Sequence, residues 1–165
     1  MKKIIFLMIS IVIGILVYEK NDVIIIPDDS IRVRIIANSN NISDLYEKKK
    51  LKEDIKNDLF SLVKNSQSKE EAEMSIQDNL EMIKDLVSKR TNDFSINYGS
   101  NYFPNKVYKG VLYNSGNYNS LVITLGQGLG DNWWCVLYPP LCMIEDNPNT
   151  SDVEYRSFVL DWLQN

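Results

Sequence analysis

Histidine is absent from this sequence of 165 residues. Its absence excludes Ser-His-Asp and Cys-His nucleophile pairs, histidine-ligated zinc sites and histidine general-base catalysis. Any catalysis would have to rest on carboxylates, lysine or tyrosine. We expect no cofactor and no metal.

Cysteine is scarce, with only Cys135 and Cys142 in the chain. Two cysteines are too few ligands for a zinc site. In an oxidising compartment they can form a disulfide, which would stabilise the fold by roughly 2–3 kcal/mol through closure of a short loop. Two small buried thiols are the alternative, and the spacing alone leaves both open.

An excess of positive charge is also missing, because the formal net charge is −4. A mildly acidic protein is a poor partner for nucleic acid or for anionic lipid. Hydrophobic residues make up 44% of the chain and aromatic residues 10%. This composition predicts a globular domain with a real core and excludes a disordered chain.

The chain starts with a basic and then apolar segment. Lys2 and Lys3 precede the uncharged run Ile4–Val17, which is the pattern of a secretory signal. As a helix the run is about 21 Å long, shorter than a comfortable membrane span. No A-x-A-like cleavage site follows, so cleavage and retention as a short anchor both stay open, and a buried terminal helix is the third alternative.

These features predict three parts of the chain. Residues 1–20 form an export signal or short membrane anchor, which is where we expect membrane contact. Residues 21–29 form a linker, and residues 30–165 form a single domain of ordinary size.

The first half of the domain has the periodicity of one strand and two helices. Ile31–Ala37 alternates between apolar and polar residues, which predicts a strand with one buried face. Ser43 is a plausible N-cap for a helix to about Val63, and the capping box Ser68-x-x-Glu71 opens a second helix that continues to about Val87. The short link between them predicts an antiparallel helical hairpin.

The second half changes to a period of two. The predicted strands are Phe94–Tyr98, Lys106–Tyr113, Tyr118–Leu125 and Trp133–Tyr138, and 114–117 (Asn-Ser-Gly-Asn) has the composition of a hairpin turn. Val153–Leu163 fits a strand or a helix. The fold class is therefore α+β, with an N-terminal strand, an antiparallel helical hairpin and a mostly antiparallel sheet.

Two polar or glycine-rich stretches invite a ligand-binding interpretation. Gly126–Gly130 has the spacing G-x-G-x-G and is followed by Asp131, whereas phosphate loops need a Lys-Ser/Thr or a G-x-G-x-x-G that opens a helix. A bend between two strands is the better interpretation. The oxygen-rich residues of 145–152 lack the frame of a calcium loop, so they indicate a solvated loop.

The stretch Asp131–Cys142 is the most distinctive of the chain. Adjacent Trp133 and Trp134 on a strand must point to opposite faces, and Pro139-Pro140 then fixes the direction of the backbone. Such a strand is either a core strand with a rigid exit or an interaction surface, since exposed aromatic residues are favoured anchors in recognition.

These motifs together resemble the stage II sporulation protein R family. The resemblance rests on Ile31–Ser39 with the helix that contains Lys48–Ile55, on Phe103-Pro104, and above all on Gly126–Cys142, which is similar to the family signature almost residue for residue. It covers about Ile31 to Cys142. The family usually has histidine at the position of Arg34.

The resemblance implies a signalling protein of endospore formation that is itself not an enzyme. Such a protein is made in the forespore and exported into the space between the two membranes. There it activates the membrane-embedded aspartic protease of the mother cell, which processes the precursor of the early mother-cell sigma factor. The expected partner-binding residues are Asn38, Ser39, Asp131, Asn132, Trp133, Trp134, Pro139 and Pro140.

Two other functions remain open at the level of sequence. A hydrolase of cell-wall glycan would use two of the carboxylates Asp131, Glu145 and Asp152, because paired carboxylates can act without histidine. A septal adaptor anchored in the membrane through residues 1–20 would have no switching role.

Overall fold

The computed structural model describes residues 24–26, 28–108 and 111–141. The predicted export segment, Cys142, the oxygen-rich residues 145–152 and the ambiguous segment Val153–Leu163 lie outside the described residues. Among the helices of the described part, none combines the length and the apolar character needed to cross a membrane.

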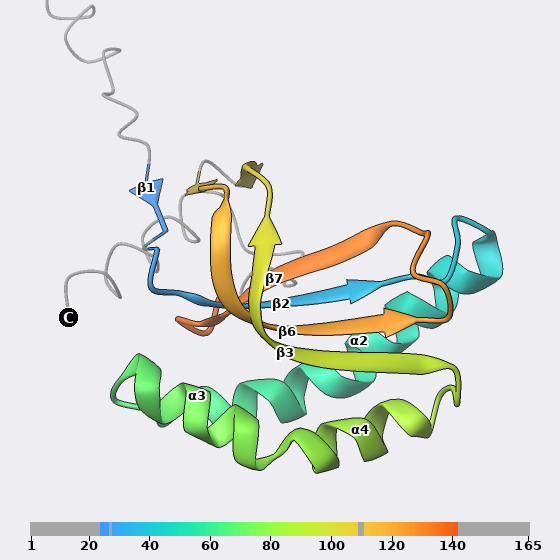
Figure 1. The fold of residues 1–165 in the computed structure, drawn as a ribbon, viewed down its shortest axis with the longest axis horizontal. Helices are drawn as coiled ribbons and strands as arrows, with labels where there is room; N and C mark the ends of the chain where they lie inside the picture. The colour runs from blue at the N-terminus through green and yellow to red at the C-terminus, as the bar shows by residue number, and fades with distance from the viewer. Residues whose placement is uncertain (1–23, 27, 109–110, 142–165) are drawn as a thin grey trace, which may run out of the picture.

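The main body is one sheet with helices on one of its faces (Figure 1). The four-stranded sheet has the order β3-β6-β2-β7, in which β6 and β2 are parallel and the two outer pairs are antiparallel. Its strands are β2 (Ile31–Ile36), β3 (Phe94–Phe103), β6 (Gly116–Leu125) and β7 (Asn132–Tyr138). The predicted α+β class is confirmed, with one parallel pair at the centre of a mostly antiparallel sheet.

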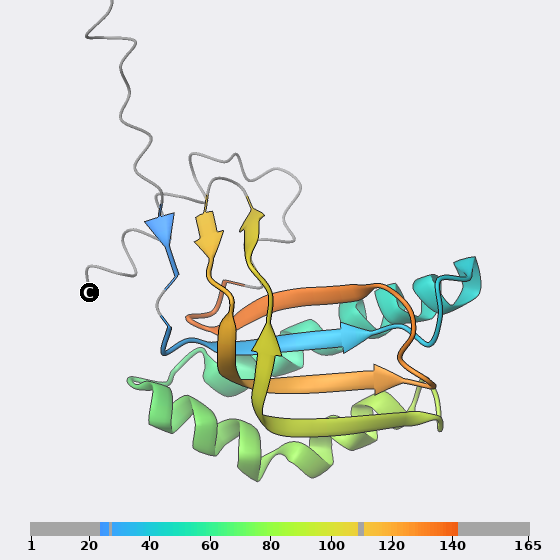
Figure 2. The same cartoon turned by 45° about the horizontal axis from the view of Figure 1, so that its top comes forward.

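Helices α2 (Ile42–Val63), α3 (Lys69–Asp78) and α4 (Leu80–Ser88) cover the same face of this sheet (Figure 2). The predicted first helix is confirmed, but its N-cap is Asn41, which makes no side-chain capping bond. Ser43 is therefore already inside the helix. The reason is local: the Ser39 hydroxyl accepts the Asn41 backbone N–H at 3.1 Å, so the preceding turn is closed before Ser43 is reached.

The predicted second helix is two helices. Ser68 caps α3 as expected, because its hydroxyl accepts the Glu71 backbone N–H at 3.2 Å. At Asn79 the backbone leaves the helical region, with φ −107° and ψ 14°. The Asn79 side-chain amide donates to the Ser75 carbonyl at 2.8 Å. A side chain that bonds to the helix backbone in this way offsets the cost of the break.

A smaller sheet rises from one end of the main sheet (Figures 1 and 2). It has the order β1-β5-β4, with strands β1 (Ile24–Ile25), β4 (Lys106–Tyr108) and β5 (Val111–Tyr113). β1 pairs in parallel with β5 and comes from the segment that the sequence predicts as a linker.

The predicted strand Lys106–Tyr113 is wrong, because these residues form the antiparallel pair β4 and β5. The predicted hairpin turn at 114–117 is wrong as well. Gly116 and Asn117 already belong to β6, which pairs with β3 over ten residues from Phe94↔Leu125 to Phe103↔Gly116. The turn-like composition marks the place where the chain passes from the small sheet into the large one.

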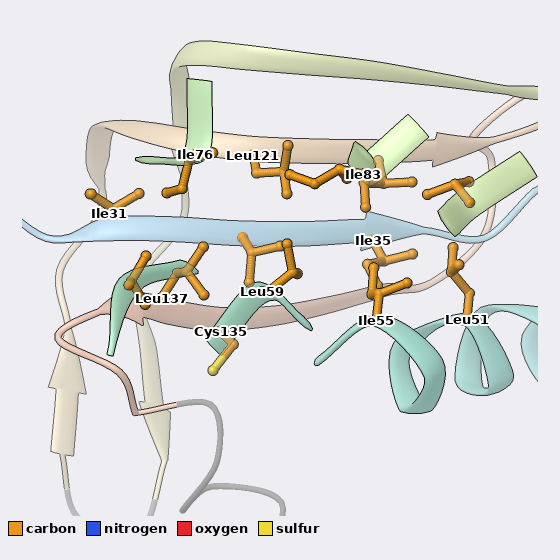
Figure 3. Packing of buried hydrophobic residues seen from close by; sticks show 14 of the residues in the cluster. Ile31, Ile35, Leu51, Ile55, Leu59, Ile76, Ile83, Leu121, Cys135 and Leu137 are labelled. Carbon is orange, nitrogen blue, oxygen red and sulfur yellow. The ribbon is translucent and has the colours of Figure 1, made fainter. Parts of the chain in front are cut away.

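The core lies between the main sheet and its helices (Figure 3). Alternate residues of β2, namely Ile31, Val33 and Ile35, have no exposed surface, and they face Leu51, Ile55 and Leu59 of α2, which are each 1% exposed. Full burial of an aliphatic side chain stabilises a fold by roughly 1.5–3 kcal/mol. The other alternate residues of β2, Arg32 and Arg34, face away from these helices.

Candidate protein-interaction surface

Four of the predicted partner-binding residues, Asn38, Ser39, Asp131 and Asn132, meet at one end of the strands of the main sheet. Since β2 and β6 are parallel and β7 runs back, the turn after β2 and the loop between β6 and β7 meet there (Figure 1). The backbone N–H of Leu129 donates to the Asn38 carbonyl at 3.0 Å, and that of Gly130 to the Ala37 carbonyl at 2.9 Å. We call residues 37–41 with 126–132 the loop edge.

Side chains lock the two halves of the loop edge together. The Asn38 amide oxygen accepts the Gln127 backbone N–H at 2.9 Å, and its amide nitrogen donates to the Asp44 carboxylate at 2.9 Å. The Ser39 hydroxyl donates to the same carboxylate at 2.6 Å. Asn38 and Ser39 therefore satisfy their polar groups inside the fold, and their first role is to shape this edge.

Asp131 joins the loop edge through its backbone. Its N–H donates to the Asn40 side-chain oxygen at 2.7 Å, and its carbonyl accepts the Lys48 ammonium at 2.8 Å. Burial lowers the pKa of Lys48, and the charge of Asp131 opposes this shift. The Asp131 side chain is exposed.

The close contacts of the glycines in this loop explain its G-x-G-x-G spacing. Gly126 has φ +52°, and a Cβ there would lie 2.2 Å from the Asn38 amide oxygen. A Cβ on Gly130 would lie 2.3 Å from the Ser39 carbonyl oxygen. Glycine is needed at Gly126 because the backbone is left-handed and the Asn38 side chain lies against it, and at Gly130 because the Ser39 backbone approaches closely. The predicted bend between two strands is confirmed.

The two tryptophans point to opposite faces of the sheet, as predicted from their adjacency. Trp133 lies opposite Ile35 and packs against the core, and the Lys52 ammonium is 5.8 Å from its ring centroid. Trp134 lies opposite Arg34 on the other face, with its ring centroid 4.9 Å from that of Phe103. Both tryptophans are half-buried.

Trp134 belongs to a group of aromatic and arginine side chains that we call the aromatic–arginine cluster: Arg32, Arg34, Phe103, Tyr118 and Trp134. The guanidinium carbon of Arg32 is 3.4 Å from the Tyr118 ring centroid, and that of Arg34 is 5.0 Å from the Trp134 centroid. Cation–π contacts of this kind are worth roughly 0.5–2 kcal/mol, the larger value when they are desolvated.

Arg32 is the buried member of the cluster, with 3% of its surface exposed. Its Nε donates to the Ser30 hydroxyl at 3.4 Å and its Nη1 to the Asn114 carbonyl at 3.2 Å. Burial lowers the pKa of Arg32, while the charges of Tyr118, Tyr113 and Asp28 oppose this shift. An arginine starts from so high a pKa that it stays charged at neutral pH.

A pocket of about 260 Å³ opens beside the cluster. Its walls are Arg32, Phe103 and Trp134 of the cluster, Tyr113 of β5, Cys135 and Val136 of β7, the connecting residues Pro104 and Asn105, and Lys106 of β4. No Asp or Glu lines it among the residues that the structure describes.

The remaining predicted residues lie elsewhere. Pro139 and Pro140 follow the far end of β7, opposite the loop edge, and Pro139 is buried. Cys135 is disulfide-bonded, and Cys142, the one other cysteine of the sequence, lies outside the described residues. Of the carboxylates considered for glycan hydrolysis only Asp131 is described, and it does not line the pocket. The described residues contain no cluster suited to a metal ion.

The residues of the cluster that were not predicted from the sequence as parts of a site include Arg32, Phe103 and Tyr118. The available signal was the alternation Arg32-x-Arg34 on a strand beside tryptophan, because arginine stacks on aromatic faces. Also not predicted were two exposed apolar residues near the loop edge, Ile42 with 89% and Leu129 with 73% of their surface exposed.

The fold and the site together define a two-layer α+β domain with an aromatic–arginine cluster on the sheet face that the described helices leave uncovered. Comparison with known proteins identifies its relatives. The family model for stage II sporulation protein R matches residues 27–148. The stage II sporulation protein R of Bacillus subtilis (strain 168) is 37% identical over 134 residues, which are 77% of this chain and 59% of that protein.

The chain belongs to the stage II sporulation protein R family, and its role is in sporulation. The matched region covers 59% of the length of the curated relative. No solved structure matches the chain.

Proposed function

We propose that this protein is an exported signal of sporulation that switches on a membrane-embedded aspartic protease of the mother cell. It is made in the forespore and carried by residues 1–20 into the space between the two membranes. The activated protease then processes the precursor of the early mother-cell sigma factor. The protein itself binds and does not catalyse.

The observation that carries this proposal is the rigid presentation of Trp134. β7 is hydrogen-bonded to β2 along its length, and the loop edge that precedes it is held by backbone and side-chain bonds. Binding through a strand that is already ordered loses little conformational entropy. A half-buried aromatic side chain on such a strand is a suitable anchor for a protein partner.

Activation places a thermodynamic demand on this surface. A protein ligand shifts its target toward the active form only if it binds that form more tightly than the inactive form. To change a 1:99 population into 99:1 the preference must be about 10⁴-fold. A preorganised surface suits this demand because it does not adapt to both forms of the protease.

Co-expression of the precursor, the protease and this protein tests the proposal. We expect precursor cleavage with the native chain, and at least about tenfold less cleavage with Trp134→Ala, since truncation of a central aromatic anchor costs about 2 kcal/mol or more. Trp133→Ala should also reduce cleavage, in part by loosening the core. Immunoblotting of the precursor and its product measures the effect.

Tyr102→Ala is the matched control, because Tyr102 is an aromatic residue of β3 with 60% of its surface exposed and no place in the cluster. It should leave cleavage unchanged. If Trp133→Ala and Trp134→Ala stay folded by circular dichroism and cleavage still proceeds at the native rate, the proposed contact surface is wrong.

A further inference from the structure

We propose that the aromatic–arginine cluster and the pocket beside it receive a segment of the partner protein in which an acidic side chain is flanked by apolar residues. The carboxylate pairs with the Arg34 guanidinium, which does not line the pocket but lies against Phe103 and Trp134 of its wall. The apolar neighbours fill the pocket itself. Because it names the chemistry of the partner, this inference rests on the proposed function. The pocket and its charge are observations that stand without it.

Both arginines of the cluster have a buried hydrogen-bond donor that is not satisfied by the described residues. Nη2 of Arg32 and Nε of Arg34 are buried and have no hydrogen-bond partner among the described residues. No described carboxylate forms a salt bridge with either arginine. Leaving buried donors of a charged group unpaired is unfavourable, so such groups in a folded protein need an explanation. A carboxylate supplies the missing acceptors.

Asp28 is a described acid whose charge acts on Arg32, but it does not fill this role. Asp28 is exposed and accepts a hydrogen bond from the Tyr118 hydroxyl at 3.3 Å. Its charge acts on Arg32 without forming a salt bridge. Arg34 has no such neighbour, since burial is the cause of the lowering of its pKa.

The wall of the pocket carries a positive charge. The buried Arg32 lines it and no acid among the described residues does, although the whole chain carries a net charge of −4. A second pocket, of about 210 Å³, adjoins the loop edge, and its charged lining residues are the three acids Asp44, Glu47 and Asp93 with one arginine, Arg90. The basic pocket is therefore a local reversal of the sign of the protein.

The same reversal decides which anion fits. An acidic protein is repelled by a polyanion or by an anionic membrane, whereas a single carboxylate beside the Arg34 guanidinium is attracted. The mainly aromatic and apolar wall requires that the carboxylate be carried by an apolar segment. A protein segment meets both conditions.

The Arg34 guanidinium lies against two aromatic rings. Its guanidinium carbon lies 5.0 Å from the Trp134 centroid and 5.6 Å from the Phe103 centroid. A guanidinium stacked on aromatic rings keeps its edge available for paired hydrogen bonds to a carboxylate. Arg34 is partly exposed, whereas buried Arg32 contributes through its charge.

The experiment uses the full-length, ¹⁵N-labelled chain in phosphatidylcholine nanodiscs, with no protease present. The probe is acetyl-Leu-Glu-Leu-amide, and its neutral counterpart is acetyl-Leu-Gln-Leu-amide. The indole N–H signal of Trp134, assigned with Trp134→Phe, reports binding. We expect the glutamate peptide to shift this signal with saturation, and to bind at least about tenfold more tightly than the glutamine peptide.

Variants separate charge pairing from general effects. Arg34→Gln should weaken the glutamate peptide about tenfold and leave the glutamine peptide unchanged, while Arg34→Lys should retain part of the preference. Lys49→Gln removes the same charge from an exposed position of α2 and should change neither peptide. Circular dichroism verifies that each variant is folded.

Three outcomes would overturn the inference: equal binding of the two peptides, no shift of Trp134 at millimolar peptide, or a native affinity in Arg34→Gln. A shift of Trp134 by phosphatidylglycerol nanodiscs but not by the glutamate peptide would assign the pocket to lipid and overturn it too. Since the assay contains no protease, a positive result stands even if activation of the protease is disproved.

Discussion

At the scale of single residues, the site is organised by contacts that leave no room for a side chain. Gly126 and Gly130 sit against Asn38 and Ser39, so the family-matched loop is a tight joint between two strand ends. A glycine pattern that suggests a phosphate loop is explained by steric need alone. Contacts of single residues also explain why Arg32 is tolerated in the interior, because Tyr118 stacks on it and two oxygen atoms accept hydrogen bonds from it.

Gly126→Ala tests the steric argument. The new methyl group would overlap the Asn38 amide oxygen and sit on a residue with φ +52°. Left-handed backbone costs a non-glycine residue roughly 1–2 kcal/mol, and the overlap adds to it. We expect the free energy of unfolding to fall by about 2 kcal/mol or more, measured by urea denaturation.

Gln127→Ala is the control, since the exposed Gln127 contributes only its backbone N–H to Asn38. It should change the free energy of unfolding by less than about 0.5 kcal/mol. Equal stability of the native chain and Gly126→Ala would show that the loop relaxes and is not a tight joint.

At the scale of elements, the helices are tied to each other as well as to the sheet. α2 packs on β2 and β7, and its Asp54 accepts a hydrogen bond from the Arg90 side chain just after α4. The break at Asn79 lets α3 and α4 each follow the surface that they cover. This arrangement leaves the opposite face of the sheet to the arginines of β2.

The ion pair between Asp54 and Arg90 predicts a dependence of stability on pH. The hydrogen bond from Arg90 lowers the pKa of Asp54 below its ordinary value of 3.8. A carboxyl group with a lowered pKa stabilises the fold above its ordinary pKa, and this contribution is lost as pH falls through the lowered value. Below about pH 4 the melting temperature should therefore fall more steeply in the native chain than in Asp54→Asn.

Asp58→Asn is the comparison, because Asp58 is exposed on the same helix and forms no ion pair among the described residues. Its melting temperature should follow the native pH profile. Thermal melts between pH 2.5 and 6 decide the matter, and identical profiles for all three proteins would mean that the ion pair does not contribute.

At the scale of the whole molecule, the two faces of the main sheet have different structural roles. One face is closed by the helices and holds the core (Figures 1 and 3). The other face carries the aromatic–arginine cluster. The chain belongs to a sporulation family, and in the proposed function its place of action is outside the cytoplasm. The redox state of its cysteines is a direct test of that location.

We expect both cysteines to be oxidised in the protein recovered from sporulating cells. Under denaturing, non-reducing conditions iodoacetamide should modify neither Cys135 nor Cys142, and after reduction it should modify both, as mass spectrometry would show. A variant without residues 1–20 stays in the reducing cytoplasm, where disulfides are rare, and should react at both positions without reduction. Free thiols in the native protein would contradict export to an oxidising space.

Much of the fold follows from local patterns. The alternation of Ile31–Ile36 predicts a strand with one buried face, and the stripe of Leu51, Ile55 and Leu59 predicts the helix that covers it. These predictions succeed because one element has to bury its own apolar face. The break at Asn79 and the split of Lys106–Tyr113 were missed, because each depends on what the chain packs against.

The same distinction applies to the site: local patterns predict some of its features, and the others depend on which strands pair. The adjacency of Trp133 and Trp134 predicts opposite faces, because side chains alternate along any strand. The interlocking of Asn38 with Gly126 could not be predicted, since it needs β2 and β6 to be parallel neighbours. Arg32 was missed because arginine in an alternating strand ordinarily faces solvent.

The sequence by itself determined the class of fold, the strand with two tryptophans and the family, because these depend on neighbouring residues and on a distinctive signature. Only the tertiary structure decided which strands pair, and therefore which side chains share a face. Pairing depends on free energy summed over contacts between residues far apart in the chain. For that reason the two arginines and the aromatic residues of three strands emerged as one cluster only in the folded protein.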